Sequence, residues 1–305
     1  MKKYSLMIAL GAVLASTSIQ AEPVTTEEAA SRAADSNTRA EDKRWTPGEE
    51  QYSQFIAEYK SGAFQSQLTQ LTEDVQKVGQ ERPELFKQTL EHARENKAKI
   101  EQMSEVNQKI LTNAISALKS ACSDNGKGEI CQLVVSLDKN GPNAKKFNDA
   151  FMGLHALALV QDTSKYDEFT KKVVTVLNAG LNKLLYPIYS KKSVDQSNMD
   201  LPKAIEFEMI ESLKKLNEQN PGNPLADKIR VVIENYPAHY ANFVDLQTLS
   251  LLANGRISPK NKEEEAVQKI AQNMEKERLE ELRKLFPMAM NQGSSQPPAS
   301  QPSAK

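Results

Sequence analysis

The stretch that decides the fold spans residues 82–160 and reads RPELFKQTLEHARENKAKIEQMSEVNQKILTNAISALKSA (82–121), CSDNGKGEIC (122–131) and QLVVSLDKNGPNAKKFNDAFMGLHALALV (132–160). In its first part, apolar residues recur at steps of three, four or seven among Lys, Glu and Gln, which is the period of one helical face. This face consists of Phe86, Leu90, Ala93, Ile100, Met103, Ile110, Ala114, Leu118 and Ala121. A proline in the first turn gives up only an amide without a partner, so we expect one helix from Pro83 to Ala121, about 60 Å long.

Cys122 and Cys131 are the only cysteines, and they flank a polar loop with two glycines and an Asn-Gly pair. A disulfide between them closes a loop of about ten residues and, on the chain-entropy model, stabilises the fold by roughly 2.5 to 3 kcal/mol. Their spacing matches neither the Cys-x-x-Cys redox pattern nor the common zinc spacings. We therefore predict a structural disulfide, with a redox pair or half of a metal site as the alternative.

After this loop the sequence predicts a short helix and then a strongly apolar one. The short helix carries apolar residues at i, i+3, i+4 and i+7, namely Ile130, Leu133, Val134 and Leu137. The next helix begins near Pro142, and its residues 151–160 are apolar on nearly every face. Such a helix belongs in the centre of a bundle, and its apolar run is too short for a bilayer, which needs about 20 residues. Together with the long helix it forms a helical hairpin.

Prolines and glycines mark the expected helix ends. The sequence predicts that Asn140-Gly141-Pro142 ends the short helix and that Tyr186-Pro187 and Tyr236-Pro237 end two later ones, because the residue before a proline disfavours helical geometry. Asn220-Pro-Gly-Asn-Pro224 is a further break, and Asn254-Gly255 is a typical helix-ending pair.

The N-terminus has the three regions of a secretory signal. Lys2 and Lys3 precede an apolar run over residues 6–14, and small and polar residues follow as far as Ala21. We therefore expect residues 1–21 to be a signal peptide that exports the chain to the periplasm or beyond. No cysteine lies near the cleavage region, so we expect no lipoprotein, and no later segment is apolar for long enough to span a membrane.

The fold class we expect is all-α, a multi-helix bundle of about nine to ten helices, forming one domain or two helical subdomains. The predicted organisation is a flexible leader (22–46), a helical bundle with the disulfide hairpin (47–188), a linker (189–200), a second helical subdomain (201–290) and a disordered tail (291–305). Removal of residues 1–21 takes away two lysines and no acidic residue, so the formal charge changes from −1 to −3. Because nucleic-acid binders usually carry a basic surplus, we expect no nucleic-acid partner.

The sequence carries no motif of a known catalytic or cofactor chemistry. Its three histidines, His92, His155 and His239, form no His-Glu-x-x-His or Glu-x-x-His pattern, and the chain has neither a glycine-rich phosphate loop nor a Gly-x-Ser-x-Gly elbow. We therefore assign no catalytic, cofactor-binding or metal-binding residues and expect no cofactor. Glu206, Glu208 and Glu211 cluster on one helix, and we interpret them as a solvated face.

His155 is the candidate buried polar residue because it lies inside the apolar run. A buried imidazole has to find a partner or stay neutral at a cost in free energy. Since no second ligand is spaced with it, a core histidine is the favoured interpretation over a metal or haem ligand.

Three hypotheses about function follow from the sequence. The first is a non-enzymatic, exported binding or scaffolding module with a protein partner that the sequence does not identify. The alternative is a secreted membrane-active or lipid-binding protein that opens its bundle to release residues 151–160. The third is an enzyme whose site assembles across helices around His155, His239 or the tyrosines.

Overall fold

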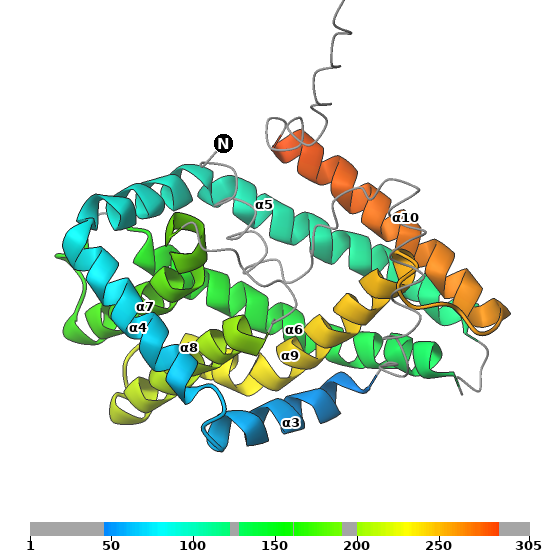
Figure 1. The fold of residues 1–305 in the computed structure, drawn as a ribbon, viewed down its shortest axis with the longest axis horizontal. Helices are drawn as coiled ribbons and strands as arrows, with labels where there is room; N and C mark the ends of the chain where they lie inside the picture. Colours follow the sequence, from blue (N-terminus) through cyan, green and yellow to red (C-terminus); the bar gives the residue numbers. More distant parts are fainter. Residues whose placement is uncertain (1–45, 123–127, 161, 191–199, 287–305) are drawn as a thin grey trace, which may run out of the picture.

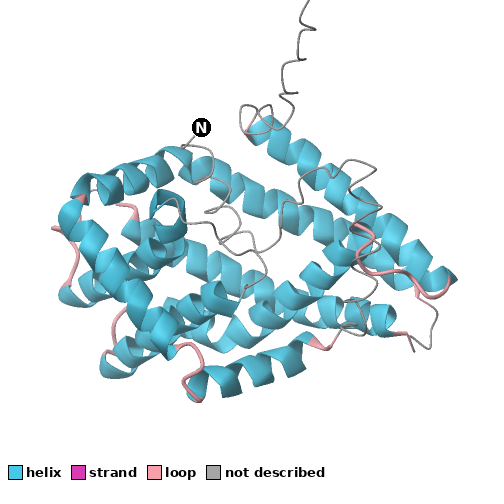
Figure 2. Ribbon diagram, in the orientation of Figure 1, coloured by secondary structure: helices cyan, strands magenta, loops and turns pink. Residues whose placement is uncertain are grey.

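The computed structural model describes residues 46–122, 128–160, 162–190 and 200–286, which form eight α-helices and no strand (Figure 1; Figure 2). The all-α multi-helix bundle is thus confirmed, with a slightly lower helix count over the described residues. The helices are α3 (Gly48–Lys60), α4 (Gln65–Glu81), α5 (Pro83–Ala121), α6 (Glu129–Ala158), α7 (Glu168–Ser190), α8 (Asp200–Gln219), α9 (Ala226–Ala253) and α10 (Lys262–Leu285). The expected signal peptide, nearly all of the leader, most of the linker and the tail lie outside the described residues.

Helix α5 has the predicted bounds and buries the predicted face. Its 39 residues correspond to a length of about 58 Å, and the helix forms one upper edge of the molecule in Figure 1. Five residues of the predicted apolar face are buried, namely Ala93, Ile100, Met103, Ile110 and Leu118. The amphipathic period alone was therefore enough to place this element.

The predicted helix end at Asn140-Gly141-Pro142 is wrong, because α6 runs through all three residues. Asn140 is buried, and its Nδ2 donates a hydrogen bond to Oγ of Ser136 at 3.2 Å. The Ser136 hydroxyl in turn donates to Oδ2 of Asp245, a fully buried residue of α9, at 2.5 Å. This network ties α6 to α9 beside the proline, so the backbone hydrogen bond that Pro142 cannot make is offset by packing.

The stops predicted at Tyr186-Pro187 and Tyr236-Pro237 are also wrong, since α7 continues to Ser190 and α9 continues to Ala253. In α9, Tyr236 and Tyr240 are buried on either side of the proline in the same core cluster. The burial of both residues requires the helix to keep its direction across Pro237. The break at residues 220–224 and the helix end at Asn254-Gly255 are confirmed, and Gly255 has the positive φ (69°) typical of that position.

The pair α6 and α9 makes the most extensive helix–helix contact, although the two helices lie on opposite sides of the expected linker. Helix α10 packs along α5 and against α9, α3 packs on α9, and α7 packs on α8 (Figure 1). Gly48 allows the close approach of α3, because a Cβ at this position would overlap the backbone of Ala241. The main core cluster takes residues from α3, α4, α6, α7, α8 and α9.

Residues 151–160 are less uniformly buried than expected. Phe151, Leu154, His155 and Ala158 are buried in the bundle, whereas the residues between them are half-buried and Val160 is 41% exposed. Among the described residues, no helix combines the length and the apolar character needed to cross a membrane.

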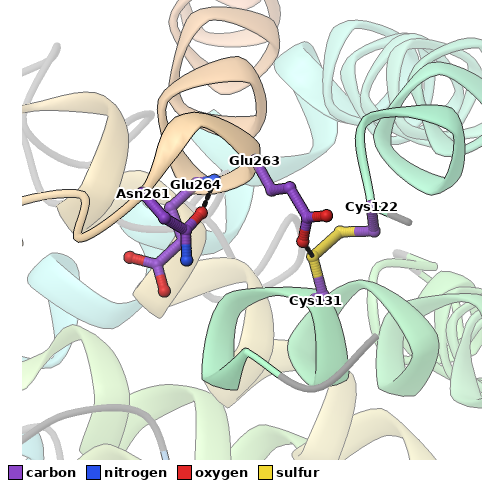
Figure 3. The surroundings of a disulfide bond; sticks show 5 residues. All are labelled: Cys122, Cys131, Asn261, Glu263 and Glu264. Carbon is purple, nitrogen blue, oxygen red and sulfur yellow. Dashed lines mark hydrogen bonds between the residues drawn. A yellow bond between two sulfur atoms is a disulfide. The ribbon is translucent and has the colours of Figure 1, made fainter. Parts of the chain in front are cut away.

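A disulfide joins Cys122, directly after α5, to Cys131 in the first turn of α6, with a Cα–Cα distance of 5.6 Å (Figure 3). The N-terminus of α10 lies beside it, capped by Asn261, whose Oδ1 accepts a hydrogen bond from the backbone N–H of Glu264 at 2.9 Å. Oε2 of Glu263 lies 3.7 Å from Sγ of Cys131. The disulfide therefore holds α5 and α6 together at the end of the bundle that α10 covers.

Candidate functional site

A cavity of about 90 Å³ lies between α5, α6, α9 and α10. Its polar lining includes carboxamides from three different helices, contributed by Asn107, Gln108, Asn148 and Asn242. Apolar side chains from α5, α9 and α10 complete the lining, among them Ile110, Phe243, Leu249 and Met274. Because four helices build the walls, only the tertiary structure brings these side chains together.

Two of the carboxamides carry atoms that have no hydrogen-bond partner among the described residues. Both Oδ1 and Nδ2 of Asn107 are buried and unpartnered, and so is Oδ1 of Asn242, a residue that is 8% exposed. A buried polar atom without a partner costs roughly 1 to 3 kcal/mol. These atoms are shielded from solvent, so a molecule in the cavity reaches them only after the amide group rotates about the soft terminal torsion of the Asn side chain.

His239 lies on the wall of the cavity and connects it to a buried ion pair. Its ring stacks on Phe147 with a centroid distance of 4.1 Å. Its Nε2 lies 3.3 Å from Oε1 of Glu206, without the alignment of a hydrogen bond. The other carboxylate oxygen of Glu206 accepts a hydrogen bond from Nζ of Lys203 at 2.8 Å. Lys203 also lies 3.9 Å from the ring centroid of Phe243, so its charge meets both an anion and an aromatic face.

The environment keeps this cluster in a fixed charge state. Burial raises the pKa of the Glu206 carboxyl, but the Lys203 ammonium, with a contribution from His239, outweighs burial and lowers that pKa to about 2. Burial lowers the pKa of His239, and the charge of Glu206 opposes this effect. At neutral pH, Glu206 is therefore ionised and His239 is neutral. The solvated face predicted for Glu206 is wrong, because its helix turns this side chain into the bundle, where it is 7% exposed.

Glu208 and Glu211 differ from Glu206 because they are half-buried at the edge of the bundle. Oε2 of Glu208 accepts a hydrogen bond from Nζ of Lys183 in α7 at 2.5 Å. The distinction between Glu206 and its neighbours has a sequence signal, since Lys203 and Glu206 stand at i, i+3 among Ala204, Ile205 and Phe207.

On α10, the two charged residues of the cavity wall neutralise one another. Nη2 of Arg278 lies 2.9 Å from Oε2 of Glu275, and Nε of Arg278 donates a hydrogen bond to the same oxygen at 3.1 Å. The side chains of Arg278 and Glu275 are 11% and 24% exposed, so the pair is partly shielded from solvent. The cavity is thus polar without an excess of either charge on this wall.

His155 does not line the cavity. It is 3% exposed, its ring meets Phe151 edge-on at 4.5 Å, and both of its ring nitrogens lack a partner among the described residues. Burial lowers its pKa to about 4, and the charge of Glu206 opposes that shift. The position is thus a core position for a neutral imidazole. Within the described ranges, no three His, Cys, Asp or Glu side chains are placed to hold a metal ion.

Comparisons with protein-family models, with curated proteins and with solved structures return no match to this chain.

Proposed function

We propose that this protein is an exported, non-enzymatic binding module and that the cavity between α5, α6, α9 and α10 is its ligand site. One observation carries the proposal: Asn107 and Asn242 line this cavity and have buried polar atoms that the protein itself does not pair. More than nine-tenths of buried polar groups in folded proteins have a partner, so these atoms are expected to be paired by a molecule from outside the chain.

Two further features support export. The first 21 residues have the pattern of a secretory signal, and the Cys122–Cys131 bond is of the kind that persists in oxidising compartments. The disulfide also fixes α5 against α6, two of the four cavity walls. Helices that are already held in place lose less conformational entropy when a ligand binds, which favours binding.

The proposal is tested by a ligand-observed NMR screen of the purified mature protein against a library of small polar molecules. At least one compound is expected to give a saturable signal that Asn242→Leu abolishes, because Leu fills the same wall without a hydrogen-bonding atom. Asn178→Leu is the matched control, since Oδ1 of Asn178 is also buried and unpartnered but does not line the cavity. No saturable compound, or equal loss in both variants, contradicts the proposal.

A serine hydrolase is the second candidate, because His239 lies against the carboxylate of Glu206 and shares the cavity lining with Ser104 and Ser250. A carboxylate that orients a histidine beside a serine is the arrangement of nucleophilic catalysis. Among the described residues, however, neither hydroxyl hydrogen-bonds the imidazole, so the binding function takes precedence. A fluorophosphonate probe separates the two: hydrolase chemistry requires labelling that Ser104→Ala or Ser250→Ala removes, and an unlabelled protein eliminates it.

A further inference from the structure

We infer that the cavity binds the uncharged primary carboxamide group of a small ligand. This inference depends on the proposed ligand site and adds the chemical class of the ligand. It is carried by the type of the unpartnered carboxamide atoms, by the charge of the walls and by the size of the cavity.

The three unpartnered carboxamide atoms match a primary amide in type. Nε2 of His239, the fourth unpartnered atom of the lining residues, lies 3.3 Å from Oε1 of Glu206. Oδ1 of Asn107 and Oδ1 of Asn242 need one donor each, and Nδ2 of Asn107 needs an acceptor. A primary amide offers two N–H donors and one carbonyl acceptor. Both side-chain atoms of Asn107 are unpartnered, so this residue needs one donor and one acceptor even if its oxygen and nitrogen are exchanged. The match at Asn107 therefore does not depend on how its own amide group is oriented.

The walls provide no uncompensated charge for an ionic ligand. The Arg278 guanidinium is paired with the carboxylate of Glu275, and the carboxylate of Glu206 behind His239 is paired with Lys203. An ion entering this site would lose its hydration without gaining a counter-ion, which is strongly unfavourable. A neutral amide loses less hydration and recovers it as hydrogen bonds to the carboxamides.

The size of the cavity limits the enclosed part of the ligand to a small group. A volume of about 90 Å³ has room for several waters or for a group of a few non-hydrogen atoms. An amide with one or two attached carbons fits this space. Its alkyl part lies against the apolar wall formed by Ile110, Phe243, Leu249 and Met274. A free small amide and the side chain of glutamine both present this group.

The experiment is an NMR titration of the mature protein with acetamide and four comparison compounds. Acetate has the same shape but a charge and no N–H; N,N-dimethylacetamide has no donor. L-Glutamine and L-glutamate differ only in the amide or carboxylate at the end of the side chain, so their comparison tests whether the cavity binds the amide of a longer molecule. Acetamide is expected to bind about tenfold more tightly than acetate or dimethylacetamide, because each hydrogen bond lost to a buried group reduces affinity by about that factor.

The variants locate the binding in the cavity. Asn107→Leu and Asn242→Leu are each expected to weaken acetamide binding about tenfold, whereas Asn178→Leu leaves it unchanged. Asn107→Asp preserves the volume and replaces the donor by an acceptor, so it tests the same contact if the Leu variant does not fold. Circular dichroism of every variant verifies the fold.

Equal binding of acetamide and acetate, or no binding of any amide, overturns the inference, and in the latter case the cavity holds water or another ligand. If amides fail while another library compound binds and is lost in Asn242→Leu, the ligand class is wrong and the proposed function stands. If no compound of any class saturates, both fall.

Discussion

Replacing His155 with Leu is expected to make the acid side of the stability profile less steep. The slope that remains includes the contribution of His239, whose pKa is also lowered by burial. Both ring nitrogens of His155 are buried without a partner, and burial lowers the pKa of this residue from 6.5 to about 4. The unfolded chain thus binds a proton more tightly than the folded protein. Consequently, the free energy of unfolding does not depend on this residue's titration above pH 6.5, and it decreases as the pH falls from 6.5 toward 4. The loss is about 2 kcal/mol at pH 5 and approaches roughly 3.4 kcal/mol well below pH 4, at about 1.36 kcal/mol per pKa unit.

The assay is urea unfolding followed by circular dichroism at intervals between pH 7.5 and pH 4.5. This range stays above the window in which Glu206 titrates: its lowered pKa contributes stability that is lost only as the pH falls from 4.5 toward 2. Ile210→Val is the control, because it removes one buried methylene, introduces no titratable group and is expected to lower stability by about 1 kcal/mol at every pH.

The result that refutes the reasoning is a wild-type profile and a His155→Leu profile that fall in parallel below pH 6.5. In that case the native protein accommodates a charged imidazole at this position, and the buried, unpartnered environment described for it is wrong.

The remaining predictions concern the disulfide and two glycines. Reduction of the disulfide, which closes a ten-residue loop, is expected to lower the free energy of unfolding by about 2.7 kcal/mol. The measurement is the urea midpoint of unfolding with and without reductant. If a variant with serine at both cysteine positions loses stability in reductant as well, the effect does not come from the disulfide. Gly48→Ala is expected to destabilise by about 1 to 3 kcal/mol in thermal unfolding, because the new Cβ overlaps the backbone of Ala241. Gly141 lies in α6, and a Cβ at this position would meet no atom within 4 Å, so Gly141→Ala is expected to stabilise the protein by up to about 1 kcal/mol. Equal effects of the two substitutions would refute the close contact between Gly48 and Ala241 as the cause of the destabilisation.

The candidate site was only partly predictable. The sequence singled out His155 as a buried polar residue but gave no reason to connect His239 with Glu206, which are 33 positions apart, and it placed Glu206 on a solvated face. Asn107 and Asn242 carried no signal at all. A cavity depends on how four helices pack, and the period of each helix says which face is buried without saying which polar residues meet there.

The sequence by itself determined the helical class and the bounds of α5, because amphipathic period and helix-start signals act within a few residues of each position. The tertiary structure decided whether the helices continue through Pro142, Pro187 and Pro237. A proline costs a helix roughly 3 kcal/mol, which ends an isolated helix. In α6 and α9, burial of the apolar residues on both sides of the proline is worth several times that amount, at roughly 1.5 to 3 kcal/mol for each large side chain, so these two helices continue.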